Sequence, residues 1–304
     1  MKPLYTGTAL QTDDIIAMLK SQGLVIEDEP QAKHILRNVS YSRLKAYMVP
    51  LMESRSTHRF RPGATFNQAY AYYGFDRRFR ELVFHELEKV EISIRTHIAY
   101  ALNGSENGYW FTNPDHFKDK KKHKYLLINL KREVERSDVD AIRSFRAKYS
   151  NEFPPSWITL EATSMGTLAT IYDEMKPGQV KDHIAAYYGL DALTFASWLH
   201  HIVYIRNICA HHGRLWNHTL TVCARIPERP KHRFPKVRKG VETNAYYTLC
   251  IIKYLQNTVK PANTFAARLK ALIDSYPLTG TKELASMGFP KEWRADEFWT
   301  DNKL

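Results

Sequence analysis

Residues 75–99 carry the pattern that most constrains the fold, because their apolar side chains repeat with the period of an α-helix. At 100° per residue, eight of these side chains fall within one arc of about 160°, and charged side chains occupy the opposite side. The eight are Phe75, Phe79, Leu82, Val83, Leu87, Val90, Ile94 and Ile98. The pattern predicts a long helix that buries one face in a core.

Most other segments are also helical in period, and no succession of alternating strands is present. One helix is expected to open at a capping box formed by Thr65 and Gln68 and another after the basic run 118–124. Further helices are expected over 13–22, 31–47, 158–175, 180–188, 191–210, 243–258 and 262–275. We expect loops at 53–63 and 103–117 and a basic, proline-rich linker at 224–240. The fold class is therefore all-α, a helical bundle with N- and C-terminal extensions.

The chain is strongly basic. Its 44 lysines and arginines against 32 aspartates and glutamates give a formal net charge of +12 and a pI near 9.4. A field of this sign attracts polyanions, so RNA or DNA is the first partner class and an anionic membrane surface the second. No apolar run approaches the roughly 20 residues that cross a bilayer, so we expect no membrane insertion.

The N-terminus and the cysteines favour a cytoplasmic location. Asp13 and Asp14 stand where a signal peptide would need apolar residues. The three cysteines, Cys209, Cys223 and Cys250, have no C-x-x-C spacing and fit neither a disulfide framework nor a zinc ribbon. A reducing compartment is the simplest interpretation.

The segment 191–212 is the candidate for chemistry. Arg206 falls inside the apolar arc of this predicted helix, and desolvating a guanidinium without an anionic partner is costly. It therefore pairs with a carboxylate, for which Glu88 and Glu91 are the candidates, or it faces an anionic ligand. His211 and His212 follow just before Gly213, which is expected to stop the helix. An arginine beside histidines can neutralise a phosphate and move a proton near neutral pH.

The string RNICAHHGRLWN at 206–217 resembles the signature of abortive-infection proteins of the Abi family, the AbiD and AbiF group. Within it, Arg206, Asn207 and His211 resemble the R-x4-6-H motif of HEPN-superfamily ribonucleases. Four more segments resemble the family in order: SYSRLKAYMVP at 40–50, FDRRFRELVFHELEKVEISIRT at 75–96, EATSMGTL at 161–168 and GFPKEW at 288–293. The resemblance covers about residues 12–295.

This resemblance implies an antiphage protein with a HEPN-like helical core, which we place at 61–223, between an N-terminal helical region (1–60) and a basic linker with a C-terminal helical region (224–304). It implies a metal-independent endoribonuclease without a cofactor, a homodimer that builds a composite site, and a small noncoding RNA as partner. Arg206 would stabilise charge on the phosphorane and His211 would act as general acid or base. Asn207 would orient the histidine or the phosphate, and His212 would supply a second titrating group.

Other residues are expected to support this site or to bind RNA. Glu88, Glu91 and Arg95 would face the helix that carries Arg206. Basic residues expected to contact the RNA backbone are Lys120, Lys121, Lys122, Lys124, Arg214, Lys231, Arg233, Lys236, Arg238 and Lys239.

Plainer interpretations stay open. His211 and His212 could simply end a helix, His97 could be a core histidine, and a zinc site from His200, His201, His211, His212 and Cys209 lacks the usual metal-binding spacings. At the level of function, the alternatives are a non-catalytic RNA-binding protein that holds a dedicated small RNA and a helical module that acts through a protein partner.

Overall fold

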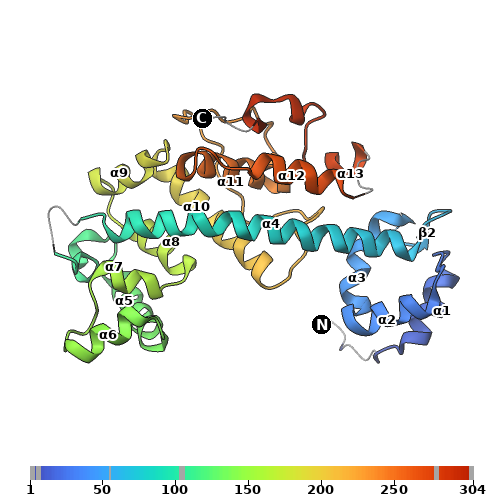
Figure 1. The fold of residues 1–304 in the computed structure, drawn as a ribbon, viewed down its shortest axis with the longest axis horizontal. Coiled ribbons are helices and arrows are strands. Elements are labelled where there is room, and N and C mark those ends of the chain that lie inside the picture. The colour runs from blue at the N-terminus through green and yellow to red at the C-terminus, as the bar shows by residue number, and fades with distance from the viewer. Residues whose placement is uncertain (1–3, 5–7, 55, 103–106, 277–280, 301–304) are drawn as a thin grey trace. The chain divides into compact units, whose positions relative to one another are not determined.

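The computed structural model describes residues 4, 8–54, 56–102, 107–276 and 281–300. In this part of the chain 64% of the protein is helical, in 13 α-helices, and 3% is strand, so the predicted all-α class is confirmed (Figure 1). By compactness the chain divides into two units, residues 1–78 and 79–304. The predicted three-part division at residues 60 and 223 stays a prediction.

The first unit contains α1 (Thr12–Ser21), α2 (Glu29–Val39), α3 (Tyr41–Met48) and the first turns of α4 (Phe66–Ala99). Its core is built from buried aliphatic side chains such as Leu19, Leu36 and Leu44. The predicted capping box is confirmed, since the Thr65 hydroxyl accepts from the Gln68 backbone N–H and the Gln68 side chain accepts from the Thr65 N–H, both at 3.0 Å.

Two sequence predictions in the first unit are wrong. The helix expected over 31–47 is broken at Ser40, which has a φ of 68° and caps α3 by accepting from the Arg43 N–H. The loop expected at 53–63 contains a short antiparallel pair, β1 (Met52–Ser54) and β2 (Arg59–Phe60), with an irregular register. Strands of two or three residues are too short to show an alternating pattern, so the sequence gives no sign of them.

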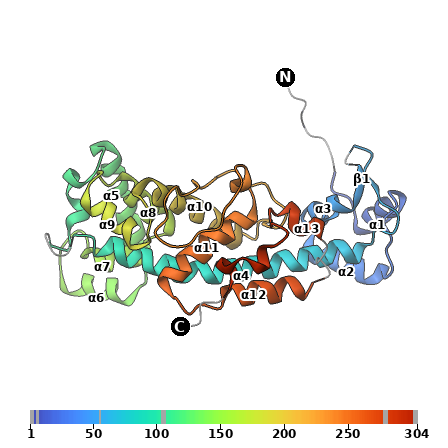
Figure 2. The same cartoon turned by 90° about the horizontal axis from the view of Figure 1, so that it is seen from above.

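The second unit contains the rest of α4 and α5 (Lys120–Arg136), α6 (Asp140–Lys148), α7 (Ser156–Thr159), α8 (Met165–Glu174), α9 (Gln179–Tyr187), α10 (Ala192–Ala210), α11 (Ala245–Val259), α12 (Phe265–Asp274) and α13 (Thr281–Ser286). All eight apolar positions predicted for the long helix are buried. Helix α8 packs against both α5 and α10 (Figure 2). Helix α11 is buried on all sides from Ala245 to Gln256 and forms the centre of the unit.

The helix expected over 158–175 is in fact divided, because Ser164 caps a new helix, α8, after α7 and a short 3-10 turn. The segment 224–240 also differs from a linker in the ordinary sense. Phe234 packs on Trp198, Tyr247 and Tyr254, with ring centroids 5.6–5.9 Å apart, and the Arg225 carbonyl accepts from the Trp198 Nε1–H at 2.8 Å. The segment is therefore a strap fixed on α10 and α11.

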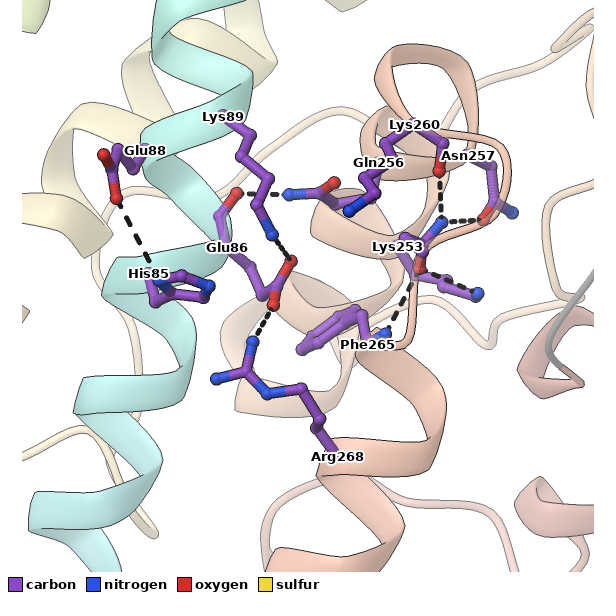
Figure 3. A network of polar contacts seen from close by, with 11 residues as sticks. His85, Glu86, Glu88, Lys89, Lys253, Gln256, Asn257, Lys260, Phe265 and Arg268 are labelled. Carbon is purple, nitrogen blue, oxygen red and sulfur yellow. Dashed lines mark hydrogen bonds and ion pairs between the residues drawn. The ribbon is translucent and has the colours of Figure 1, made fainter.

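A buried polar network joins α4 to α11 and α12 (Figure 3). The Glu86 side chain is buried, and its carboxylate accepts from Arg268 and pairs with Lys89 at 3.4 Å. The Glu86 carbonyl accepts from the Gln256 side chain. Because a buried carboxylate is costly without cationic partners, these contacts fix α12 against α4.

Candidate functional site

The site is built on the C-terminal end of α10, where the chain turns sharply. The His212 N–H donates to the Cys209 carbonyl at 3.2 Å and the Gly213 N–H to the Ile208 carbonyl at 2.8 Å. These two bonds form a Schellman motif in which the left-handed position belongs to His212, with a φ of 57°. The prediction that Gly213 is the left-handed stop is therefore wrong by one residue. The turn leaves Asn207, His211 and His212 exposed.

Arg206 lies at the edge of the buried face of α10, as its place in the apolar arc predicts. Its side chain is 37% exposed, its Nε is buried, and that Nε lies 3.8 Å from Oε2 of Glu91. This distance permits an ion pair but is too long for a hydrogen bond, and the Nε has no other hydrogen-bond partner among the described residues. The guanidinium stands 5.6 Å from the centre of the Phe84 ring. Part of the arginine charge is thus held by α4 and part faces solvent.

Glu91 also binds Arg95, so one carboxylate serves two arginines. Arg95 donates to Oε1 of Glu91 and to the Thr163 carbonyl, both at 3.0 Å, and to the Leu160 carbonyl at 2.9 Å. These bonds place Glu91 with its other oxygen toward Arg206. Of the two predicted acidic candidates, Glu91 therefore contacts Arg206. Glu88 is 65% exposed and lies 4.0 Å from His85 instead.

The histidines considered for a metal site have other roles. His201 is fully buried, with Nδ1 2.6 Å from the Val222 carbonyl and Nε2 2.9 Å from the Thr248 hydroxyl. Burial lowers the pKa of His201 to about 4. Among the described residues no three histidine, cysteine or acidic side chains are grouped as metal ligands. His97 is half-buried, with Nδ1 2.8 Å from the Ser93 carbonyl and its ring against Tyr187, as a structural histidine would be.

The basic run at the start of α5 is exposed but partly paired. Lys122 binds Glu174 at 2.8 Å and Lys120 lies 3.7 Å from Asp115. Lys121 and Lys124 are exposed and belong to the same first turns. This surface is within the reach of a polyanion, and its role in RNA binding stays a prediction.

The second group of basic residues lies on the strap. Lys231, Arg233, Lys236, Arg238 and Lys239 are exposed, whereas Arg214, near the end of α10, is half-buried. Arg233 is paired with Glu297 and lines two neighbouring hollows of about 670 and 410 Å³. The Lys231 N–H donates to the Gly189 carbonyl at 2.9 Å, which fixes the start of this basic stretch.

The sequence did not point to Phe84, the Arg206 contact on α4. Phe84 lies opposite the centre of the apolar arc of 75–99, and a large aromatic residue on a charged helix face is the signal that could have found it. The carbonyls of Leu160 and Thr163, which hold Arg95, carry no signal in the side-chain sequence.

The fold and the site define an all-α, basic protein with an arginine–carboxylate cluster beside a histidine-bearing helix end. The chain itself belongs to the family of Abi-like proteins, whose family model matches residues 34–217, more than half of its length. This membership supports a role in abortive infection. Comparison with curated proteins gives no match, and comparison with solved structures gives none either. In the described residues no helix is long and apolar enough to span a membrane.

Proposed function

We propose that this protein is an abortive-infection endoribonuclease that cuts single-stranded RNA at a HEPN-type site formed by Arg206 and His211. One observation carries the proposal: Arg206 is oriented by Glu91 but is not consumed by it. Its Nε–Glu91 distance of 3.8 Å leaves the guanidinium without a tight bidentate pair, and 37% of the side chain is open to solvent. A partly exposed guanidinium beside exposed imidazoles suits a phosphate ligand.

The chemistry uses groups that the protein and the RNA already carry. The ribose 2′-hydroxyl attacks the adjacent phosphorus while His211 takes its proton, and the bond from phosphorus to the 5′-oxygen breaks as a second imidazole protonates that oxygen. The products are a 2′,3′-cyclic phosphate and a 5′-hydroxyl. Proton transfer of this kind contributes about 10²–10⁴ in rate, and Arg206 would add about 10²–10³ by stabilising the phosphorane.

His212 and Asn207 complete the proposed site. His212 is the candidate for the second titrating group. Asn207 precedes His211 by one helical turn and is exposed with it, so its amide could orient the imidazole or the phosphate. No metal ion or cofactor is needed for these steps.

A homodimer would double this site. The chain has one R-x4-H motif, and two copies would supply two arginines and two histidines to one phosphate. The exposed face of α4 next to Arg206 carries Phe84 and Ile92, which are large apolar side chains suited to a second copy. A small noncoding RNA as a resident partner belongs to the same proposal, supported by the net charge and the exposed lysines of α5.

The proposal is tested with purified protein and a labelled single-stranded RNA. We expect cleavage that persists with EDTA, yields a 2′,3′-cyclic phosphate, and fails on an RNA with a 2′-deoxy residue at the cut site. His211→Ala should lower the rate by at least about 10²-fold. His200→Ala is the matched control, because His200 is an exposed histidine of the same helix outside the motif.

The outcomes separate the alternatives. Cleavage that is equally fast in His211→Ala contradicts the proposed site, and cleavage abolished by EDTA contradicts the metal-free mechanism. Retained RNA in the purified protein without turnover in any preparation would instead identify a non-catalytic RNA-binding protein that forms a ribonucleoprotein.

A further inference from the structure

A groove of about 260 Å³ lies between α5 and α8, which pack side by side (Figure 2). From α5 it is lined by Lys122, Tyr125 and Asn129, and from α8 by Thr167, Thr170 and Glu174. None of these residues except Lys122 belongs to the proposed cleavage site or its predicted RNA contacts. The groove therefore needs an account of its own.

Glu174 has one oxygen that the protein leaves without a donor. Its side chain is only 8% exposed, and Oε1 accepts from Lys122 at 2.8 Å. Oε2 is buried and has no hydrogen-bond partner among the described residues. Leaving a buried carboxylate oxygen unsatisfied is costly, so this atom calls for a donor from outside the fold.

The other polar groups of the groove are also acceptors. The Thr167 hydroxyl donates to Glu133 at 2.9 Å, and the Thr170 hydroxyl donates to the Gly166 carbonyl at 3.0 Å. Since each hydroxyl has only one proton, the oxygens of both threonines can only accept further hydrogen bonds. A molecule that fits this groove must therefore present N–H or O–H donors.

The rim of the groove shows what kind of molecule carries those donors. The Tyr125 ring is 69% exposed at its mouth, and Lys120, Lys121 and Lys124 are exposed on the same turns of α5. The lysines repel a cationic ligand and attract a polyanion. An exposed aromatic ring offers a stacking surface for a planar ring.

We propose that this groove reads an unpaired guanine of the bound RNA. The Watson–Crick edge of guanine has two adjacent donors, N1–H and the N2 amino group, whereas uracil has one donor between two carbonyl acceptors that would face the acceptors of the groove. The base stacks on Tyr125 while its amino group donates to Oε2 of Glu174. The inference rests on the proposed function, because it assumes that RNA is the ligand.

The test compares two labelled uridine oligomers, one of them with a single central guanosine, by fluorescence anisotropy in the full chain carrying His211→Ala, which prevents turnover. We expect the guanosine oligomer to bind about tenfold more tightly. Glu174→Gln should reduce this preference to about twofold or less, since the neutral amide is a weaker acceptor. Glu152→Gln is the matched control, because Glu152 also pairs with a lysine of α5, Lys131 at 2.9 Å, but lies outside the groove.

A second variant keeps the test independent of folding. Thr170→Val removes an exposed acceptor without touching the Glu174–Lys122 pair, and it should lower the guanine preference about threefold. Equal binding of the two oligomers overturns the groove proposal and leaves RNA binding intact, whereas no binding of either oligomer overturns the proposed function. A short arginine peptide that binds the groove in the absence of any base preference would assign it to a protein partner and also overturn the proposal.

Discussion

Replacing His201 with glutamine should remove a large part of the stability that the second unit loses at mildly acidic pH. His201 is fully buried in α10, and its burial lowers its pKa from 6.5 to about 4. Its ring connects α10 to the strap and to α11, with Nδ1 donating to the Val222 carbonyl and Nε2 accepting from the Thr248 hydroxyl. Both bonds require the neutral imidazole.

The sign follows from where the proton binds first. Below pH 6.5 the imidazole of the unfolded chain takes up a proton, while the folded chain excludes it until about pH 4. Stability is therefore complete above pH 6.5 and falls as the pH is lowered toward 4. At about 1.4 kcal/mol per pH unit, the whole window amounts to about 3 kcal/mol, and the step from pH 7.5 to pH 5.0 to about 2 kcal/mol.

Urea unfolding followed by tryptophan fluorescence measures this effect, because all six tryptophans lie in the second unit. We expect the free energy of unfolding to fall by about 2 kcal/mol less in His201→Gln than in the natural chain between pH 7.5 and pH 5.0. His200→Gln is the control, since His200 is exposed and its substitution should leave the pH dependence unchanged. An identical pH dependence in the natural chain and in His201→Gln would refute the reasoning.

Two further substitutions test the packing around the site by thermal unfolding. Gly189→Ala should destabilise the protein by about 3 kcal/mol, because the φ of 69° disfavours a side chain and the new Cβ would lie 2.9 Å from the Tyr254 hydroxyl; Gly166→Ala, with its nearest contact at 3.7 Å, should be tolerated, and equal melting of the two variants would contradict this. Arg268→Ala should cost about 2–3 kcal/mol because it leaves the buried Glu86 with fewer cationic partners, and Arg268→Lys should cost less (Figure 3). A melting temperature unchanged in Arg268→Ala would show that the pair does not hold α12.

The long helix was predictable because its signal comes from a stripe of buried residues that a single chain segment carries in full. All eight positions of that stripe are buried. The break at Ser40 was not predictable in the same way, because it depends on one residue with a φ of 68° inside a continuous helical pattern. Hydrophobic period reports which face is buried and says little about where a helix is interrupted.

The site was predictable in part for the same reason. The apolar arc of α10 identified Arg206 as an arginine that needs an anion, and the structure supplies one. Sequence alone left Glu88 and Glu91 open because they are three residues apart on one helix, and only the packing of α4 against its neighbours turns Glu91 toward Arg206 and Glu88 toward solvent. The groove between α5 and α8 was not predictable at all, since it arises from the register of two helices.

His212 offers the sharpest remaining test of the cleavage site, because the chain keeps a histidine where the backbone favours glycine. Its φ of 57° is left-handed, and the next residue is Gly213. A non-glycine residue in this conformation costs about 1 kcal/mol, so His212→Gly should raise the free energy of unfolding by about that amount. If the imidazole protonates the leaving oxygen, the same variant should cut RNA at least about 10²-fold more slowly.

His58→Gly is the matched control, since His58 has the same residue type and a similar φ of 52° in the β1–β2 turn. It should gain stability and keep full cleavage. Cleavage unaffected in His212→Gly would mean that the histidine serves no purpose at the helix end, and the proposed second titrating group would have to be sought elsewhere. Stability gained together with cleavage lost would show that backbone strain is maintained at this turn for the sake of the side chain.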